Sequence, residues 1–380
     1  MNVRDLEVYP IEYDLGSGNA LGGTRGVTNT RTATLVKLTG SDGTVGWGEA
    51  FAPPRTVAEL IDEVFRDEVI GISPWDVGSL SEDVYTGVIG GYHFGRQAFT
   101  QAALTGIEVA LWDLRGKVVG EPVRELLGGR SRPTVTPYAS TMYITEWGQD
   151  PAVPIQEAAD EGFTAAKIKI GRSVEDDQLR VKTAREVLGP EAEIMVDYNG
   201  NCTPSEAIKS IREIEEYNLT WVEEPVPPED KDGYRTVGNA VDAPLAAGEA
   251  HFGRFEFTEL LEKGLIDIVQ PNLGRCGGFG EARYIAQHAA TNNISVRPHV
   301  WNSGVGLAAA LQFTSTVPAY PKRIDRADET ILFEFDRSEN PLRHDILVDP
   351  FDPTGGTLSV PDDPGLGIEV DERALETYSI

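Results

Sequence analysis

The chain has 380 residues, of which 40% are hydrophobic, so it is long enough to bury a core larger than that of one small domain. Its 61 acidic side chains outnumber 33 basic ones and give a formal net charge of −28, which argues against nucleic acid and anionic membranes as partners. Nine of the basic residues are lysine, and abundant acid with scarce lysine favours a halophilic protein over an ordinary acidic mesophilic one.

Two cysteines, Cys202 and Cys276, are too few for a disulfide framework or a thiolate metal site, and we expect buried free thiols. Residues 1–18 contain no basic segment followed by an apolar run. No stretch of about 18 apolar residues occurs elsewhere. These observations predict a soluble cytoplasmic protein.

The first third of the chain predicts an α+β unit. Residues 2–14 alternate between apolar and polar and predict a strand, and residues 30–50 predict two strands joined by a tight Asp-Gly turn. The apolar residues then take a helical period over residues 55–125, most clearly in residues 101–120. The Pro- and Gly-rich tail is expected to fold back onto this unit.

After this unit, short apolar strands alternate with helical segments. The strands span residues 134–140, 165–171, 192–200, 220–225, 243–249, 266–272, 294–300 and 331–336. Eight β/α units in one run favour an α/β fold with a parallel barrel over an open doubly wound sheet.

The active site of such a barrel lies at the carboxyl ends of its strands. Nearly every predicted strand of this chain ends in a charged or polar residue. In chain order these residues are Lys167, Lys169, Asp197, Asn199, Glu223, Glu249, Asn272, His299 and Glu334. A barrel built for stability alone would close with apolar layers, so this arrangement predicts a catalytic site.

Three of these residues, Asp197, Glu223 and Glu249, come from successive strands. Carboxylates that converge on one point cannot all stay ionised unless a cation lies between them. All-oxygen ligands favour Mg²⁺, and the sequence has no HxH or HExxH pattern for zinc. The alternative is that one or more of these acids pairs with a barrel Arg or Lys; the spacing favours the metal site.

The strand residues Lys167 and Lys169 lie two positions apart and therefore face the same side. Burial and a nearby cation would lower the pKa of an amine, so we expect Lys169 to remove a proton. Lys167 would hold the substrate carboxylate or lower the pKa of its neighbour. The alternative is that both lysines only form salt bridges with the acids.

The proton that such a base removes would lie α to a carboxylate. We expect Mg²⁺ and a protonated Glu334 to stabilise the enolate as it forms. His299, on the opposite side of the barrel from Lys169, would be a second acid or base on the other face of the substrate.

This pattern resembles the enolase superfamily, in its mandelate racemase/muconate-lactonising group, which uses a Lys or His base assisted by Mg²⁺. The resemblance covers essentially the whole chain. It includes GTVGWGEA (43–50), ALTGIEVALWDLRGK (103–117), KIKIG (167–171), DYNGN (197–201), WVEEP (221–225), AAGE (246–249), QPNLGRCGGFGEA (270–282), RPHVWNSGVGLAAALQF (297–313) and EFDRSENPLR (334–343).

The resemblance implies a modified (β/α)7β TIM-type barrel over residues 129–344. An α+β capping domain would comprise residues 1–128, completed by a tail of about residues 345–380. It also implies which strand-end residues do which work. The implied metal ligands are Asp197, Glu223 and Glu249, the implied KxK pair is Lys167 and Lys169, and the implied histidine and carboxylate-facing acid are His299 and Glu334.

One position departs from the family pattern, because many members have Asp where this chain has Asn272. An amide can orient His299 but cannot stabilise an imidazolium as a carboxylate does, so we expect His299 to act as a general acid or polar contact. Lys169 would then be the sole strong base. This disfavours racemisation and leaves β-elimination or cycloisomerisation, with His299 protonating a leaving group.

Within the group, the segments around Glu334 and in the tail look most like the sugar-acid cycloisomerases acting on galactarolactone or 3,6-anhydrogalactonate, and next most like the sugar-acid dehydratases. The substrate would be a small carboxylate, and a homo-oligomer is expected. A Schiff-base aldolase, a metal-free glycoside hydrolase and a non-catalytic binding protein are the alternative classes.

The Gly-rich segment 16–26 is expected to form a lid over the barrel mouth. Arg25 in this lid is a candidate anion contact, with a solvated loop Arg as the alternative, and Trp301 is either pocket lining or core. The remaining candidates for substrate contact are Asn199, Asn272, Tyr143 and His93.

Overall fold

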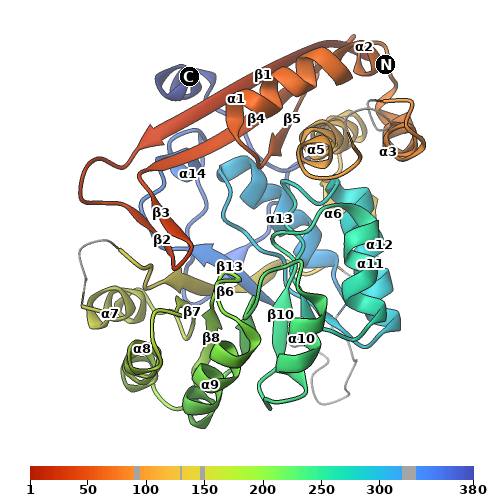
Figure 1. Ribbon diagram of the computed structural model, residues 1–380. Coiled ribbons are helices and arrows are strands. Elements are labelled where there is room, and N and C mark those ends of the chain that lie inside the picture. The colour runs from red at the N-terminus through yellow and green to blue at the C-terminus, as the bar shows by residue number, and fades with distance from the viewer. Residues whose placement is uncertain (90–94, 129–130, 146–149, 319–330) are drawn as a thin grey trace.

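The computed structural model describes the chain except for residues 90–94, 129–130, 146–149 and 319–330 (Figure 1). A capping unit built mainly from the first third of the chain lies over one end of a barrel (Figure 1). This arrangement places the barrel mouth between the two units.

The capping unit is built on a three-stranded antiparallel sheet of β1 (Val3–Asp14), β4 (Thr30–Gly40) and β5 (Val45–Ala50). The long helix α5 (Phe99–Val119) packs on β5 at very short range, because a Cβ atom at Gly48 would lie 2.0 Å from the carbonyl oxygen of Gly106. The strands expected over residues 2–14 and 30–50 are therefore present.

Shorter elements complete this unit. The helical ones are α1 (Pro54–Leu60), η1 (Ile61–Phe65), α2 (Arg66–Val69), η2 (Pro74–Asp76), α3 (Val77–Thr86) and α6 (Val123–Leu127). A small hairpin, β2 (Leu21–Gly23) and β3 (Gly26–Thr28), leaves the sheet and reaches the barrel mouth (Figure 1). The backbone N–H of Ile144 donates to the carbonyl oxygen of Gly22 at 2.9 Å, so the hairpin is fastened to the barrel.

The barrel contains all eight of the strands expected from the sequence. They are β6 (Thr134–Thr141), β7 (Ala165–Lys169), β8 (Glu193–Asp197), β9 (Trp221–Glu223), β10 (Leu245–Ala247), β11 (Ile268–Val269), β12 (Ser295–Val296) and β13 (Leu332–Asp336). Neighbouring strands pair in parallel in the order β12-β11-β10-β9-β8-β7-β6-β13.

Helices alternate with these strands. They are α7 (Ala152–Asp160), α8 (Val174–Leu188), α9 (Pro204–Ile214, followed by η3, Glu215–Tyr217), α10 (Lys231–Gly238), α11 (Gly253–Glu262), α12 (Gly278–Thr291) and α13 (Gly304–Thr316). In the described residues each of these helices follows one strand and precedes the next, and β13 closes the series. This is the (β/α)7β order, so the expected fold class is confirmed.

The C-terminal tail contacts both units. After α14 (Pro341–His344), the short strand β14 (Leu358–Ser359) pairs antiparallel with the start of β6. Helix α15 (Glu372–Tyr378) lies beside β1 (Figure 1), and the N–H of Ile380 donates to the carbonyl oxygen of Pro10 at 3.1 Å. The end of the tail thus returns to the capping unit as expected, whereas β14 belongs to the barrel sheet; the domain boundaries themselves stay a prediction.

None of the helices in the described part of the chain is both long and apolar enough to span a membrane.

Candidate active site

The inside of the barrel is layered, because alternate residues of a strand point to the same side. The lower layer is apolar and comprises Tyr138, Ala165, Met195, Trp221, Ala246 and Ile268, one from each of β6 to β11. Two positions further along their strands, Lys167, Asp197 and Glu223 occupy the same face. The polar layer therefore rests on an apolar floor at the carboxyl ends of the strands.

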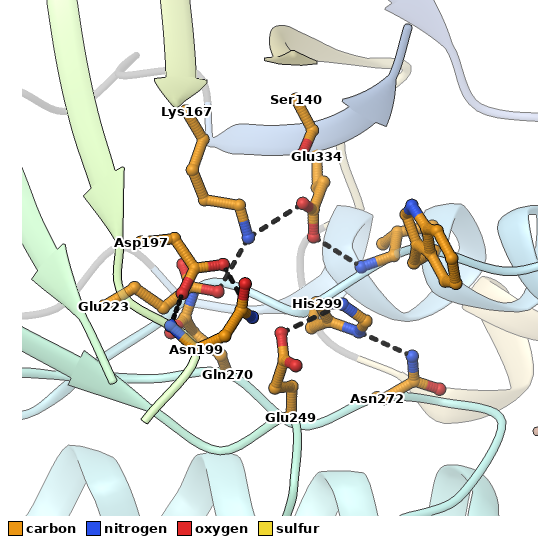
Figure 2. A network of polar contacts seen from close by, with 12 residues as sticks. Ser140, Lys167, Asp197, Asn199, Glu223, Glu249, Gln270, Asn272, His299 and Glu334 are labelled. Atoms are coloured by element: carbon orange, nitrogen blue, oxygen red, sulfur yellow. Dashed lines mark hydrogen bonds and ion pairs between the residues drawn. The ribbon is translucent and has the colours of Figure 1, made fainter. Parts of the chain in front are cut away.

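The carboxylates of Asp197, Glu223 and Glu249 gather at one point of this polar layer (Figure 2). One oxygen from each residue lies within 4.8 Å of the others. Burial raises the pKa of Glu223 to about 7, as expected for carboxylates crowded into a site with little water. The sequence argument thus correctly brought these three residues together.

The neighbours of the three carboxylates fix their orientation. Asp197 accepts hydrogen bonds from the backbone N–H of Asn199 at 2.8 Å and from its side-chain amide at 3.1 Å. Glu223 Oε2 accepts from Gln270 Nε2 at 2.6 Å, and the buried Oε2 of Glu249 accepts no hydrogen bond from the described residues. An all-oxygen set with one buried oxygen that lacks a donor fits a hard divalent cation such as Mg²⁺.

Lys167 lies between two carboxylates in the polar layer. Its Nζ is 2.7 Å from Glu223 Oε1 and 2.8 Å from Glu334 Oε1, and the residue is 1% exposed (Figure 2). Burial lowers the pKa of this ammonium, but the charges of Glu223 and Glu334 outweigh burial and the pKa is raised. Lys167 therefore stays a cation that holds these two acids in place.

Lys169 lies nearer the mouth, and its Nζ is 2.5 Å from Asp197 Oδ2. The lowering of its pKa that we expect beside a divalent cation stays a prediction, because the protein groups alone act in the other direction. Burial lowers the pKa, but the charge of Asp197 raises it by more. Because the same carboxylate oxygen holds the ammonium, a cation that binds Asp197 competes with the proton on Lys169.

The expectation of a protonated Glu334 is wrong. Burial raises the pKa of Glu334, but the neighbouring ammonium of Lys167 lowers it further, and the net direction is downward. The backbone N–H of Val300 also donates to Glu334 Oε2 at 2.8 Å. Glu334 is therefore an ionised carboxylate that accepts hydrogen bonds.

His299 faces the carboxylate cluster from the far side, with Nε2 3.1 Å from Glu249 Oε2 (Figure 2). Its Nδ1 lies 2.8 Å from the side-chain nitrogen of Asn272. Burial lowers the pKa of His299 to about 4, so the ring is neutral near pH 7. This agrees with the sequence argument that Asn272 would leave His299 a weak base.

Lys169 and His299 lie on opposite sides of a cavity of ≈ 480 Å³. Glu249 and Glu334 are among the other residues that line it. Asn199 lines it too, whereas Asn272 is fully buried behind His299 and outside the lining. The expectation that Asn272 contacts the substrate is therefore corrected. A larger cavity of ≈ 590 Å³ lies in the tail between residues 348 and 369, and no Lys, Arg or His lines it.

The other candidates for substrate contact differ in whether their polar atoms already form hydrogen bonds within the protein. Arg25 is exposed at the tip of the hairpin and lines the cavity. Trp301 also lines it, and its Nε1 donates to Tyr143 Oη at 3.0 Å. Tyr143 Oη in turn donates to Asp336 Oδ1 at 2.8 Å, so its proton is already used. His93 lies outside the described residues.

Sequence reasoning missed two residues of the site. Gln270 orients Glu223, and Arg275 lies over the ring of Phe51 at 4.3 Å and lines the cavity with a buried Nε that has no partner among the described residues. Both lie in residues 270–275, the segment that contains Asn272. Several polar residues directly after a buried strand could have identified this segment as part of the site.

Comparisons with known proteins agree with this site. The family described as mandelate racemase / muconate lactonizing enzyme, N-terminal domain, matches residues 23–128, and the family described as enolase C-terminal domain-like matches residues 152–374. D-galactarolactone cycloisomerase of Agrobacterium fabrum is 37% identical over 351 residues, which cover 92% of this chain and 91% of that protein.

Two further proteins are similar over most of their length. D-galactonate dehydratase of Xanthomonas euvesicatoria pv. vesicatoria is 31% identical over 90% of each chain. The crystal structure of 3,6-anhydro-D-galactonate cycloisomerase from Zobellia galactanivorans covers 100% of both chains, with a TM-score of 0.88 and 31% identity. The matched families and relatives span both the capping unit and the barrel, and the chain therefore belongs to the mandelate racemase/muconate lactonizing enzyme group of the enolase superfamily.

Proposed function

We propose that this protein removes the proton α to the carboxylate of a sugar acid or its lactone, and that the reaction is completed as a cycloisomerisation. One observation carries the proposal: Lys169, Glu249 and His299 line a single cavity, and the buried carboxylates of Asp197 and Glu223 gather with that of Glu249. The substrate class is supported by the relatives, which are named for galactarolactone, galactonate and anhydrogalactonate.

Asp197, Glu223 and Glu249 would hold Mg²⁺, since they offer oxygen donors from three neighbouring strands. When bound, the ion would stabilise the negative charge that develops on the substrate carboxylate. Lys167 holds Glu223 and Glu334 in position and lowers the pKa of Glu334. Glu334 lines the cavity with an ionised carboxylate, so it accepts hydrogen bonds from substrate hydroxyls instead of donating a proton.

The proton balance assigns distinct roles to the two sides of the cavity. Lys169, as the free amine, takes the α-proton, and the electron pair forms a carbon–carbon double bond while the bond from the β-carbon to oxygen breaks. His299 faces the leaving oxygen as a hydrogen donor. The enol that results regains a proton and becomes a keto acid, and the Lys169 ammonium loses its proton to solvent.

The identity of the leaving oxygen decides the reaction class. In a lactone this oxygen belongs to the ring, so the ring opens, no atom leaves, and the reaction is an isomerisation. In an open-chain sugar acid the same step expels a hydroxyl group, which takes up a proton from solvent and leaves as water. This makes a dehydratase the second candidate, as in the relative from Xanthomonas. Racemisation is disfavoured, because a neutral His299 held by Asn272 is a weak base.

We predict that a screen of aldonic acids, aldaric acids and their lactones with Mg²⁺ in D₂O and concentrated salt will show deuterium at the α-carbon of recovered substrate. The keto acid product should carry deuterium at the former β-carbon, where the enol regains its proton. Mass spectrometry and NMR of the products read out exchange even where turnover is slow. A product of unchanged mass apart from deuterium supports cycloisomerisation, and loss of water supports dehydration. Trapping of a substrate adduct by borohydride, or full activity in EDTA, would contradict the proposal.

The metal site gives a second prediction. Glu249→Gln replaces a carboxylate ligand with an amide. We expect Mg²⁺ affinity to fall at least about 10- to 100-fold, which is the loss seen when a residue that only hydrogen-bonds to a metal ligand is removed. Isothermal titration calorimetry with Mg²⁺ measures this directly. Asp177→Asn is the control, because Asp177 is a buried carboxylate that accepts hydrogen bonds from Ser210 and Gly171 and lies outside the carboxylate cluster. Equal affinity in wild type and Glu249→Gln would place the ion elsewhere.

We also propose that the protein works in a salt-rich cytoplasm as a homo-oligomer on a small carboxylate. The net charge of −28 and the scarcity of lysine support the salt requirement. Repeating the D₂O assay in low salt tests it, since activity should then decline. Sedimentation of the same sample reports the mass of the assembly.

A further inference from the structure

A buried chain of hydrogen bonds runs from the capping sheet to the ring of His299. It begins at Glu49 on β5, which is 1% exposed. Glu49 Oε2 accepts from the backbone N–H of Gly306 at 2.9 Å and from Ser303 Oγ at 2.5 Å, and Oε1 accepts from Asn302 Nδ2 at 2.9 Å. Burial raises the pKa of Glu49, but the hydrogen bonds from Ser303, Asn302 and Gly306 lower it and favour the ionised form. Backbone N–H groups, which can only donate, contact both of its oxygens, so Glu49 is the acceptor at this end of the chain.

The accepting role of Glu49 sets the orientation of Asn302. Its amide nitrogen must face Glu49, so its oxygen faces away and accepts from Asn272 Nδ2 at 3.0 Å. The next side chain, Asn272, is fixed a second time from another direction. Its Oδ1 accepts from the backbone N–H of Gly274 at 2.7 Å, which again requires its nitrogen to lie on the side of Asn302 and His299.

Asn272 Nδ2 has two protons and two neighbours. One proton goes to Asn302 Oδ1, and the other points at His299 Nδ1, 2.8 Å away. A ring nitrogen that accepts a hydrogen bond carries no proton, so Nδ1 is unprotonated and the ring proton is on Nε2. Nε2 is the nitrogen beside Glu249 Oε2 and the cavity.

We propose that Glu49 of the capping unit is a positioning residue that acts through Asn302 and Asn272 to hold His299 as the Nε2–H tautomer. His299 then meets the substrate as a hydrogen donor. The catalytic role of this tautomer rests on the proposed function, whereas the assignment of the tautomer rests only on the hydrogen bonds. A carboxylate at residue 272 would instead accept a hydrogen bond from Nδ1–H and leave Nε2 with a lone pair.

The test is ¹⁵N NMR of the full-length protein with ring-labelled histidine and saturating Mg²⁺, near neutral pH. The chain has 5 histidines, and loss of one signal set in His299→Gln assigns its ring. Protonated and unprotonated ring nitrogens resonate in separate regions. We expect Nδ1 to be unprotonated and Nε2 protonated. A protonated Nδ1 in the wild-type protein overturns the proposal without any further variant.

Two variants cut the chain at different points. Glu49→Gln leaves one acceptor oxygen for the donors of Ser303 and Gly306 and turns an NH₂ group toward Asn302, where a carboxylate oxygen had accepted. Asn302→Ala removes the link itself without altering Glu49. Each should raise the population of the Nδ1–H tautomer roughly 2- to 10-fold, the effect of one ordinary hydrogen bond. Asn272→Asp should invert the tautomer or protonate both nitrogens. Wild-type spectra from both Glu49→Gln and Asn302→Ala would overturn the role of Glu49.

Glu108→Gln is the matched control. Glu108 is 2% exposed, lies on α5 of the same unit, and accepts from the backbone N–H groups of Phe279 and Gly280 at 2.8 and 2.9 Å. It has no part in the chain to His299, so its spectrum should equal that of the wild type. The expected tautomer without turnover of any lactone would count against the proposed function alone. Lactone turnover with a protonated Nδ1 would count against this inference alone.

Discussion

Lys169→Met is expected to abolish deuterium exchange at the α-carbon and to lower kcat/KM roughly 10²- to 10⁴-fold, the usual contribution of a general base. Methionine keeps most of the length of the side chain but has no amine, so it fills the site and cannot take a proton. The measurements are NMR-detected exchange in D₂O and steady-state rates on the best substrate of the screen.

Magnesium affinity separates loss of the base from loss of the metal. The Lys169 ammonium lies 2.5 Å from Asp197 Oδ2 and so competes with a cation for that oxygen. Lys169→Met should therefore bind Mg²⁺ at least as tightly as the wild type. His299→Gln is the complementary variant, since it keeps the base and should retain exchange while product formation slows. Exchange at the wild-type rate in Lys169→Met would assign the base to another residue.

The barrel and its acidic cluster could be predicted because they depend on local patterns and on one rule of topology. Each strand is a short apolar run with a polar end, and parallel strands in one barrel bring those ends to the same rim. Asp197, Glu223 and Glu249 lie on or directly after neighbouring strands, so their order along the chain was sufficient to place them together.

The electrostatic states could not be predicted, because they depend on distances that the sequence does not contain. Lys167 reaches Glu334, 167 residues later, at 2.8 Å, and that contact keeps Glu334 ionised. Proximity to a cluster of acids raised the pKa of Lys169 where a bare divalent ion would have lowered it. Each outcome depends on the balance between burial and the charges of several neighbouring groups.

The role of Asn272 was only half predictable. Its difference from the aspartate of many relatives was visible in the sequence, and the weak basicity of His299 followed from it. Its position behind the ring, and its connection to Glu49 more than 200 residues earlier, arise from packing of the capping sheet on the barrel. Patterns within one segment contain no information about such a contact.

Lys167→Met is expected to lower the free energy of unfolding by about 3–5 kcal/mol, the cost of removing one partner from a buried ion pair. Lys167 is 1% exposed, and its Nζ lies within 2.8 Å of both Glu223 and Glu334. Methionine would leave these two carboxylates buried with no cation between them. Denaturant unfolding in EDTA measures the effect, because a bound metal ion would otherwise neutralise part of the same charge.

Lys182→Met is the matched control for this loss. The side chain of Lys182 is 57% exposed and lies 3.8 Å from Glu186, so its removal should change the free energy of unfolding by no more than about 0.5 kcal/mol. Adding Glu334→Gln to Lys167→Met removes one uncompensated charge, and the double variant should therefore be more stable than Lys167→Met alone. If Lys167→Met unfolds at the same denaturant concentration as Lys182→Met, the predicted loss of stability is absent. Lys167 would then not be needed to stabilise the two buried carboxylates.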